Sequence, residues 1–240
     1  MELSKIRLME GVPKESLFAN AFAGTMRIEI DPSLRRDYHG LMVHEITIDG
    51  LKVRRETQEL DDFKREVANK VRESYNVESL KDVETIRKYR DFFWKLGIDP
   101  TKIRPASEAL IRRILQGKEL PKINTAVDAY NLVSIETHIA IGAFDDGLLK
   151  GQLTMRYAQE GEEFMGIGMK EPKKLSGQEI VISDDEHLAA IYPYRDADLT
   201  KITDRTETIY ILSCGVPGIE MENLREASFM TKEYFNRFCK

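Results

Sequence analysis

The chain has 240 residues, of which 42% are hydrophobic and 32% are charged, a balance that supports a buried core in one large domain or two small ones. The formal net charge of −5 argues against tight, non-specific binding to nucleic acid, because a basic excess usually drives such binding, and we expect no DNA partner. No run of 18 or more apolar residues occurs, so we expect no membrane-spanning helix and no membrane partner.

The N-terminus and the cysteines predict where the protein resides. The stretch Met1-Glu2-Leu3-Ser4-Lys5-Ile6-Arg7 carries charges where a secretory signal needs an apolar segment. Cys214 and Cys239 are too few for a disulfide framework, and neither belongs to a CxxC pair. We therefore expect a cytoplasmic protein in a reducing compartment.

The first part of the chain predicts two strands followed by two helices. Residues 26–30 and 41–48 alternate in hydrophobicity, as strands do. Apolar residues at helical spacing predict a helix over residues 60–75. A second helix is expected from Ser79, with Asp82 completing a capping box, to a C-cap at Gly97.

The rest of the chain predicts helices first and strands afterwards. Pro105 can open a third helix that Gly117 closes, and a fourth should begin near Asn124 or Thr125. A last helix is expected over residues 222–238. The predicted strands are residues 139–144, 153–157, 179–183, 188–192 and 208–213. This order predicts an α+β fold, with layers of helices on a mostly antiparallel or mixed sheet. We expect residues 1–85 to pack as strands and helices on a main domain of residues 86–240.

Motifs for metal, cofactor and nucleophilic chemistry are absent from the sequence. None of the four histidines forms HExxH, and no Cys/His cluster has zinc spacing, so we expect no metal and no cofactor. No GxSxG elbow or GxxxxGK[ST] loop occurs. Gly166-Ile167-Gly168 predicts a turn, and Cys214 predicts a buried residue at a strand end. The catalytic residues stay unassigned.

A polar stripe marks the predicted fourth helix. Asn124, Asp128 and Asn131 fall at positions i, i+4 and i+7, so they share one helix face, and Ser134 lies nearby. Such a stripe can face water while the opposite side packs on a core. It can equally line a cleft in which amide and carboxylate groups recognise a polar ligand. Both interpretations stay open at this point.

The sequence around this stripe resembles a known module. Residues 120–133, LPKINTAVDAYNLV, and the run Gly142-Ala143-Phe144-Asp145 resemble the B3/B4 module of the phenylalanyl-tRNA synthetase β subunit, which reads roughly RPINxxVDxTNYV…GxPxHAFD. The match continues in order to Thr203-Asp204-Arg205-Thr206 and covers about residues 100–215. Arg104-Pro105 and Arg195-Asp196 are more similar to the free-standing B3/B4 proteins of bacteria and archaea.

The resemblance implies an editing activity on a layered α/β fold. In the synthetase, the module hydrolyses tyrosine wrongly attached to phenylalanine tRNA; water attacks the ester, and neither a metal nor a covalent nucleophile takes part. Here Tyr130-Asn131 stands for the family's threonine-asparagine pair, Gly142 for its histidine and Leu212 for its glutamate. A site that rejects phenylalanine must hydrogen-bond the phenol of tyrosine. We therefore expect an altered, less polar pocket instead of a tyrosine-specific one.

Three functions are compatible with the sequence. The first is a free-standing editing factor for a mischarged aminoacyl-tRNA. The second is a non-catalytic module that binds a free amino acid, a related metabolite or a folded RNA. The third is an enzyme of another class on the same scaffold. The candidate substrate-binding residues are Asn124, Asp128, Tyr130, Asn131, Gly142, Arg195, Asp196, Thr206 and Leu212.

Specific roles follow for some of these candidates. Asn131 could hold the amino acid backbone, while Arg195, Asp196 and Thr206 could orient the ester or the water. The alternative for Arg195 and Asp196 is a surface salt bridge worth under about 1 kcal/mol. Asp145 is expected to cap a turn. Basic residues that could face RNA phosphates, or simply solvent, are Arg104, Arg112, Arg113, Lys118 and Lys122.

Overall fold

The computed structural model describes residues 27–240, so the prediction drawn from residues 1–7 lies outside the described part. The helices are α1 (Pro32–Asp37), α2 (Gln58–Ser74), α3 (Glu84–Lys95), α4 (Ala106–Leu115), α5 (Thr125–Thr137) and α6 (Met221–Phe238), with the 3-10 helices η2 (Leu80–Asp82) and η3 (Asp146–Leu148). The strands are β1 (Ile28–Ile30), β2 (Met42–Ile48), β3 (Ala140–Asp145), β4 (Leu153–Tyr157), β5 (Glu163–Phe164), β6 (Lys173–Lys174), β7 (Ile180–Ser183), β8 (Leu188–Ile191), β9 (Arg195–Asp196) and β10 (Ile209–Gly215).

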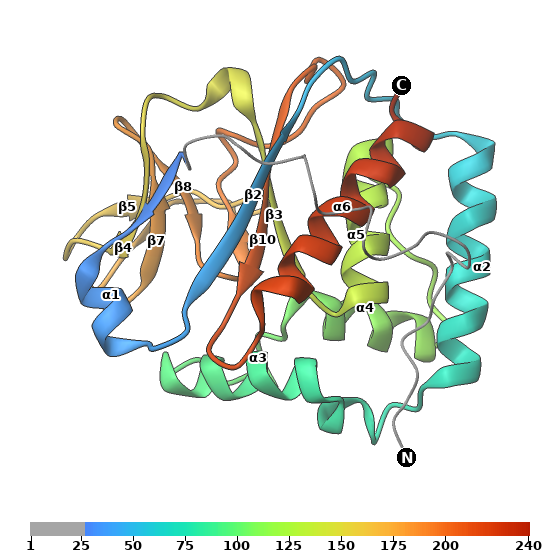
Figure 1. Ribbon diagram of the computed structural model, residues 1–240, viewed down its shortest axis with the longest axis horizontal. Coiled ribbons are helices and arrows are strands. Elements are labelled where there is room, and N and C mark those ends of the chain that lie inside the picture. Colours follow the sequence, from blue (N-terminus) through green and yellow to red (C-terminus); the bar gives the residue numbers. More distant parts are fainter. Residues whose placement is uncertain (1–26) are drawn as a thin grey trace.

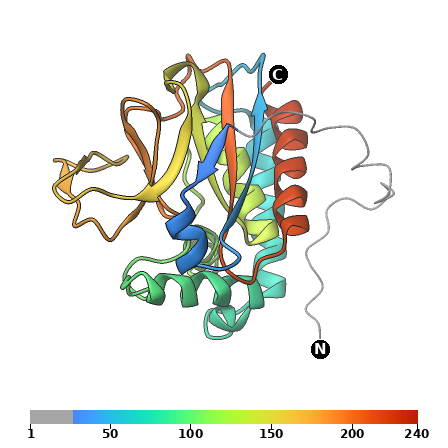
Figure 2. The ribbon, with the colours of Figure 1, turned by 60° about the vertical axis from the view of Figure 1, so that its left-hand side comes forward.

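These strands form sheets that stack against each other. Five strands pair in the order β1-β4-β7-β8-β9, three in the order β2-β10-β3, and β5 pairs with β6. The β1–β4 pair is parallel, while the other recorded strand pairs are antiparallel. The five-stranded sheet lies on one side of the three-stranded sheet, and α5 and α6 cover the other side (Figures 1 and 2). The predicted α+β fold with a mixed sheet is confirmed.

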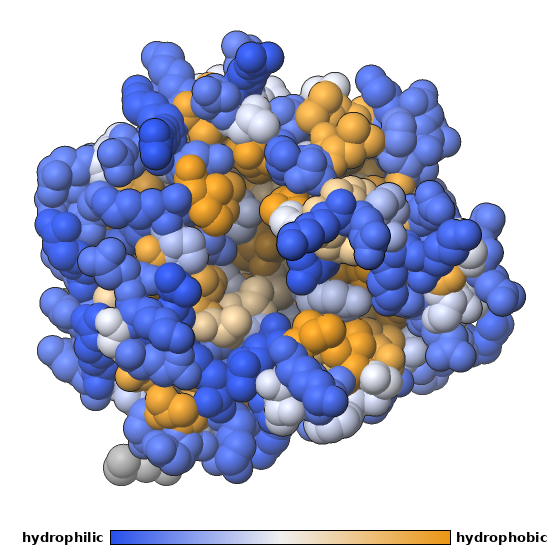
Figure 3. Space-filling view, turned by 180° about the vertical axis from the view of Figure 1, so that it is seen from behind, coloured by the Kyte–Doolittle hydropathy of each residue, from blue (hydrophilic) through white to orange (hydrophobic). Residues whose placement is uncertain are grey.

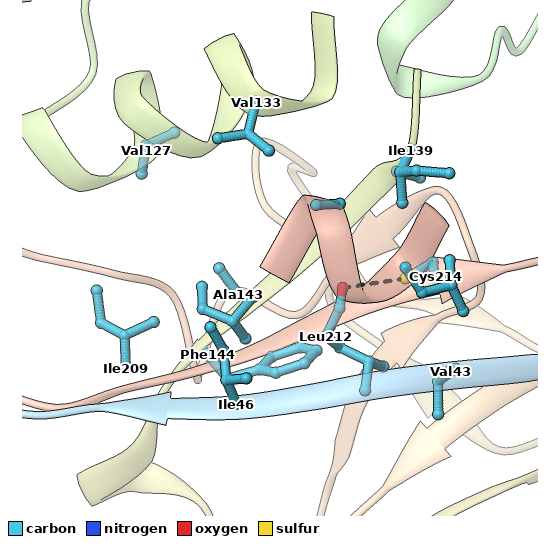
Figure 4. Close-up of a cluster of buried hydrophobic side chains, with 14 of the residues drawn as sticks. Val43, Ile46, Val127, Val133, Ile139, Ala143, Phe144, Ile209, Leu212 and Cys214 are labelled. Atoms are coloured by element: carbon cyan, nitrogen blue, oxygen red, sulfur yellow. Dashed lines mark hydrogen bonds between the residues drawn. The ribbon is translucent and has the colours of Figure 1, made fainter. Parts of the chain in front are cut away.

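Strand β10 lies at the centre of this arrangement and is buried along its whole length. Because side chains alternate across a strand, Ser213 faces α6, where its hydroxyl is 2.8 Å from that of Ser228. Leu212 therefore faces the opposite way, toward the five-stranded sheet. Figure 4 shows Val127 and Val133 of α5 on the helix side of the strands that carry Phe144 and Leu212. Packing on both faces explains why every residue of β10 is buried.

The segment before residue 86 contributes strands to both large sheets. β2 pairs along its full length with β10, from Met42 opposite Gly215 to Ile48 opposite Ile209. β1 pairs with β4, with Ile28 opposite Leu153. Buried residues of this segment belong to the same core cluster as those of α5 and β10. The predicted N-terminal segment is thus hydrogen-bonded into the sheets of the main domain.

The second predicted helix starts later than the sequence suggested. The hydroxyl of Ser79 makes no capping hydrogen bond, and only the short 3-10 helix η2 follows it. Val83, in an extended conformation, separates η2 from α3, which begins at Glu84. The prediction of one helix from Ser79 with a capping box is wrong, because Asn76 accepts the Ser79 amide in a turn of its own. The predicted end was right, since Gly97 has φ +70°.

The other predicted elements occur within about two residues of their expected ends, and α1, β5, β6 and β9 were not foreseen. Asn124 caps α5 by accepting a hydrogen bond from the Val127 amide at 2.9 Å. Gly168, at φ +80°, lies in the predicted turn. Within residues 27–240, no helix is long and apolar enough to cross a membrane.

Candidate functional site

A cavity of about 180 Å³ opens between the two large sheets and the middle of α5. Its walls come from α5, β3, β7, β8, β9 and β10 and from the turn after β8. Most of the lining side chains are apolar or aromatic. The predicted site residues that line it are Tyr130, Asn131, Gly142, Arg195, Asp196 and Leu212. Figure 3 shows the back of the molecule, where a hollow with apolar walls interrupts a mostly hydrophilic surface.

Two of these residues meet directly across a strand pair. Gly142 on β3 is the Cα partner of Leu212 on β10, so both positions lie on the cavity side. A Cβ atom added to Gly142 would lie 3.7 Å from Oδ1 of Asp196 and 3.5 Å from the ring of Phe144. The missing side chain of Gly142 therefore leaves room directly in front of the Asp196 carboxyl group.

Helix α5 brings Tyr130 and Asn131 to the same cavity. The helix is fixed at its start by the Asn124 cap and ends at His138, whose positive φ of 61° turns the chain into β3. Within residues 27–240, no hydrogen bond holds the side-chain amide of Asn131 or the hydroxyl of Tyr130. Burial raises the pKa of Tyr130, and the nearby negative charge of Asp196 adds to the shift. Both polar groups are thus available to a ligand.

Asp196 supplies the acid of the cavity. The two-residue strand β9 pairs with β8. Asp196 of β9 lies beside the edge of β3 with which no described strand pairs, and there the Ala143 amide donates to Oδ2 at 3.4 Å. Burial raises the pKa of Asp196 to about 7, against the opposing effect of this hydrogen bond. The guanidinium of Arg195 instead donates to the Ile167 carbonyl at 3.0 Å. The alternative of an Arg195–Asp196 surface salt bridge is therefore wrong.

Cys214 and Tyr192 also line the cavity, although the sequence analysis assigned neither to it. Burial raises the pKa of the Cys214 thiol, and the charge of Asp196 adds to the effect. A thiol held protonated in this way is a poor nucleophile. The Tyr192 hydroxyl donates to the Gly215 carbonyl at 2.6 Å and so closes one wall.

Three predicted site residues lie outside the cavity and stabilise the structure around it. Asn124 caps α5 and also donates to the Ile202 carbonyl at 3.3 Å. Asp128 accepts a hydrogen bond from Lys64 at 2.5 Å. Thr206 donates to Asp145 at 2.6 Å. Because Asn124 and Asp128 are buried, the interpretation of a water-facing stripe is wrong, and of the stripe only Asn131 reaches the cavity.

The Asp145 prediction is confirmed by the turn that follows β3. Asp145 accepts a hydrogen bond from the Gly147 amide at 3.1 Å and caps the short helix η3. Ser134, the other polar residue of α5, is buried and donates to the Ile139 carbonyl at 2.7 Å. Both side chains therefore serve local structure.

The predicted RNA-facing residues are separated and partly neutralised. Arg112 donates to the buried carboxylate of Glu108 at 2.8 Å. Lys122 pairs with Asp61 at 2.5 Å. Arg113 donates to the Glu119 carbonyl, and Arg104 is exposed before α4.

A second cavity, of about 330 Å³, lies between α2 and the loop before α5. Lys118 and Lys122 line it together with Arg65 and Arg72 of α2. Arg65 pairs with Asp62, and Arg72 donates to Asn69 at 3.0 Å. The groove therefore brings several cations together near the predicted patch, but carboxylates neutralise much of their charge.

The described residues contain no candidate metal site. Between residues 27 and 240, no group of three or more His, Cys, Asp or Glu side chains is placed to hold a metal ion. The cavity itself contains one carboxyl group and one thiol. Its chemistry is therefore that of a small apolar pocket with an acid, an amide and a phenol at its walls.

Comparison with known protein families identifies the domain that contains this cavity. The model of the B3/4 domain matches residues 88–240. The chain belongs to the B3/4 domain family. This match includes every lining residue of the 180 Å³ cavity.

Relatives of this B3/4 protein are subunits of a tRNA ligase. It is 30% identical over 156 residues to the phenylalanine–tRNA ligase beta subunit of Fusobacterium nucleatum and 31% identical over 114 residues to that of Corynebacterium diphtheriae. These matches cover 65% and 48% of this chain but only 19% and 13% of the two relatives. The chain is thus related to one module of a much larger subunit.

A solved structure gives a distant likeness. An N-terminal fragment of the phenylalanyl-tRNA synthetase beta subunit from Pyrococcus horikoshii aligns with 88% of this chain and 48% of its own, at 13% identity and a TM-score of 0.48.

Proposed function

We propose that this B3/4 protein hydrolyses the ester bond of a mischarged aminoacyl-tRNA, with a pocket that is less polar than that of a tyrosine-editing site. The observation that carries this proposal is the convergence of Tyr130, Asn131, Gly142 and Leu212 on one cavity. These residues come from three elements, at positions that the sequence resemblance aligns with pocket residues of the synthetase module. A cavity at those positions is what an aminoacyl-binding function requires.

The size of the cavity supports a single amino acid side chain as occupant. Its volume is about 180 Å³, while an apolar cavity of roughly 150 Å³ can hold benzene. Drug-sized ligands occupy pockets of roughly 300–1,000 Å³. The apolar residues Ile182, Ala190 and Leu212 form much of the wall. An aliphatic or small aromatic amino acid is therefore the expected substrate class.

The lining residues favour direct attack by water. Cys214 is held protonated by burial, so the cavity presents no activated thiol. The unpaired amide of Asn131 can hydrogen-bond the amino acid backbone and hold the ester carbonyl in one orientation. Restricting that orientation is a source of rate enhancement, because it removes the entropy of bringing the reacting groups together.

A second candidate function is an amino-acid-binding module without catalysis. It is favoured by the residues at positions 142 and 212, because Gly142 and Leu212 offer neither a general acid nor a general base where the family has histidine and glutamate. The same cavity would then bind a free amino acid or a related metabolite.

Hydrolysis of mischarged tRNAs separates these functions. The substrates are tRNAs carrying tyrosine, isoleucine, methionine or alanine, and the readout is the rate of ester loss with and without the protein. We expect acceleration for at least one of them, a tenfold or greater loss with Asn131→Ala, and no loss with Asn236→Ala, which changes an exposed residue of α6. Binding of a free amino acid with no acceleration for any ester would replace the editing function with the binding module.

A further inference from the structure

Asp196 is a carboxyl group that the fold leaves without a countercharge. In the described part of the chain, no Lys, Arg or His side chain forms an ion pair with it, even though its neighbour Arg195 is a cation. Its Oδ2 atom accepts one long hydrogen bond, from the Ala143 amide, and no recorded hydrogen bond reaches Oδ1. A half-buried carboxyl group with one weak donor is unfavourable for the folded protein.

The free oxygen points to the open space of the cavity. Oδ1 lies 3.7 Å from the position of an added Cβ at Gly142, which is itself a lining residue. The phenol of Tyr130 and the amide of Asn131 line the same cavity. A ligand atom in front of Gly142 would therefore lie next to the Asp196 carboxyl group, while the Arg195 guanidinium donates to the Ile167 carbonyl.

We propose that Asp196 binds an ammonium group of the ligand through Oδ1. A cation supplies the countercharge that the fold lacks, and a charge-assisted hydrogen bond is about twice as strong as a neutral one. A neutral hydroxyl donor would leave the carboxylate charge uncompensated in a site that is largely shielded from water. The apolar walls formed by Ile182, Ala190 and Leu212 then enclose the carbon skeleton next to the ammonium group.

This assignment extends the proposed function, because every aminoacyl ester carries an α-ammonium group. An amine at the end of the ligand's side chain has the same chemistry, and the cavity volume of about 180 Å³ admits either orientation. Three amides distinguish binding of the α-amine from binding of a side-chain amine. L-Leucinamide has only the α-amine, N-acetyl-L-lysinamide has only the side-chain amine, and N-acetyl-L-leucinamide has neither.

The test is calorimetric or NMR titration of the purified chain with each amide at pH 7.5. We expect N-acetyl-L-leucinamide to bind at least tenfold more weakly than one of the two amines. Asp196→Asn should remove that difference. The matched control Asp198→Asn changes a carboxylate paired with Lys201 outside the cavity and should leave affinity unchanged.

Thermal unfolding distinguishes a ligand-binding role from a structural one. If Asp196 is retained for binding, Asp196→Asn should weaken amine binding while keeping or raising the melting temperature above pH 7, because a half-buried charge without an ion-pair partner is removed. Equal binding of all three amides, no binding of either amine at millimolar concentration, or no effect of Asp196→Asn would overturn the inference. Amine binding with no tRNA deacylation would instead leave it intact and remove the editing function.

Discussion

Lys64 on α2 donates a hydrogen bond to Asp128 on α5 at 2.5 Å, and both side chains are buried. The same ammonium group also donates to the Pro121 carbonyl at 2.7 Å, and the second oxygen of Asp128 accepts the Ile123 amide at 3.1 Å. This pair therefore fixes the loop before α5 as well as the contact between the two helices. It orients the helix that carries Asn131 into the cavity.

Removing one partner of this pair should destabilise the protein strongly. We expect Asp128→Ala to lower the free energy of unfolding by up to about 3–5 kcal/mol, because the buried Lys64 ammonium would lose its hydrogen-bonded carboxylate and keep only Asp61, at 4.0 Å. The double variant Lys64→Met, Asp128→Leu should recover much of that loss, since it leaves no unpaired charge. Urea unfolding followed by circular dichroism measures both changes. Equal losses for the single and double variants would show that the lost charge pairing does not cause the destabilisation.

The affinity for an α-amine such as L-leucinamide should pass through a maximum between about pH 7 and 8. As the pH is lowered below 7, the affinity should fall about tenfold for each pH unit. Burial raises the pKa of Asp196 to about 7, and binding needs its ionised form. Above pH 8 it should fall, because an α-amine with a pKa of about 7.7–8.0 loses its proton.

The groups around Asp196 should not obscure this profile. Tyr130 of α5 and Cys214 of β10 have raised pKa values and stay neutral in this range, and the Arg195 guanidinium is held by the Ile167 carbonyl. Titration of L-leucinamide at five pH values tests the profile. Asp196→Asn should lose the acid limb, and an acid limb that survives in this variant would contradict the assignment.

Substitution of Gly142 should reduce cavity volume without harming the fold. In Gly142→Ala the added methyl group would have ordinary contacts with Phe144 and Asp196, at 3.5 and 3.7 Å. We expect a melting temperature near that of the wild type and severalfold weaker binding or slower hydrolysis. In Gly215→Ala the methyl group would lie 2.6 Å from the Met42 carbonyl oxygen, so we expect a loss of about 1–3 kcal/mol. Comparable stability of the two variants would contradict this contrast.

Glu136 should make stability depend on pH. Its side chain is buried at the end of α5, Tyr234 donates to Oε2, and Oε1 has no hydrogen-bond partner among residues 27–240. Burial raises the pKa of Glu136 from an ordinary value of 4.5 to about 7. Between these values the folded state binds more protons than the unfolded state, so stability should fall as pH rises from about 4.5 to 7 and level off above.

The shift corresponds to about 3 kcal/mol at most. Glu136→Gln keeps the shape of the side chain and cannot ionise. Its stability curve should therefore be flatter than that of the wild type over this range, with the two curves separating as pH increases. Denaturant unfolding at pH 5, 6, 7 and 8 measures the difference, and parallel curves would show that Glu136 does not ionise on this scale.

Local sequence signals predicted most of the fold, because they act over short distances. The Asn124 cap, the Gly97 and Gly117 C-caps and the alternation in β2 each depend on neighbouring residues. The ordered motifs of the resemblance also predicted that positions 142 and 212 share a site, and the β3–β10 register places them directly opposite each other.

The roles that were mispredicted depend on contacts distant in sequence. Asp128 has the residue type and spacing of a cleft residue, but its partner Lys64 lies 64 positions earlier. Asp196 lies on a strand of two residues, which is too short to show a periodicity. Its distance from Gly142, and the lack of an ion pair to it within the described residues, follow only from how the two sheets meet.

The residues that precede the family match also belong to the two large sheets. The B3/4 match begins at residue 88, after β1, β2 and α2 have been formed. Without those elements, β10 would lose its partner along all of β2, and the carboxylate of Asp128 would lose Lys64. The residues that the family model matches are thus fewer than those hydrogen-bonded into the two large sheets, because β1 and β2 each add a strand from the preceding segment.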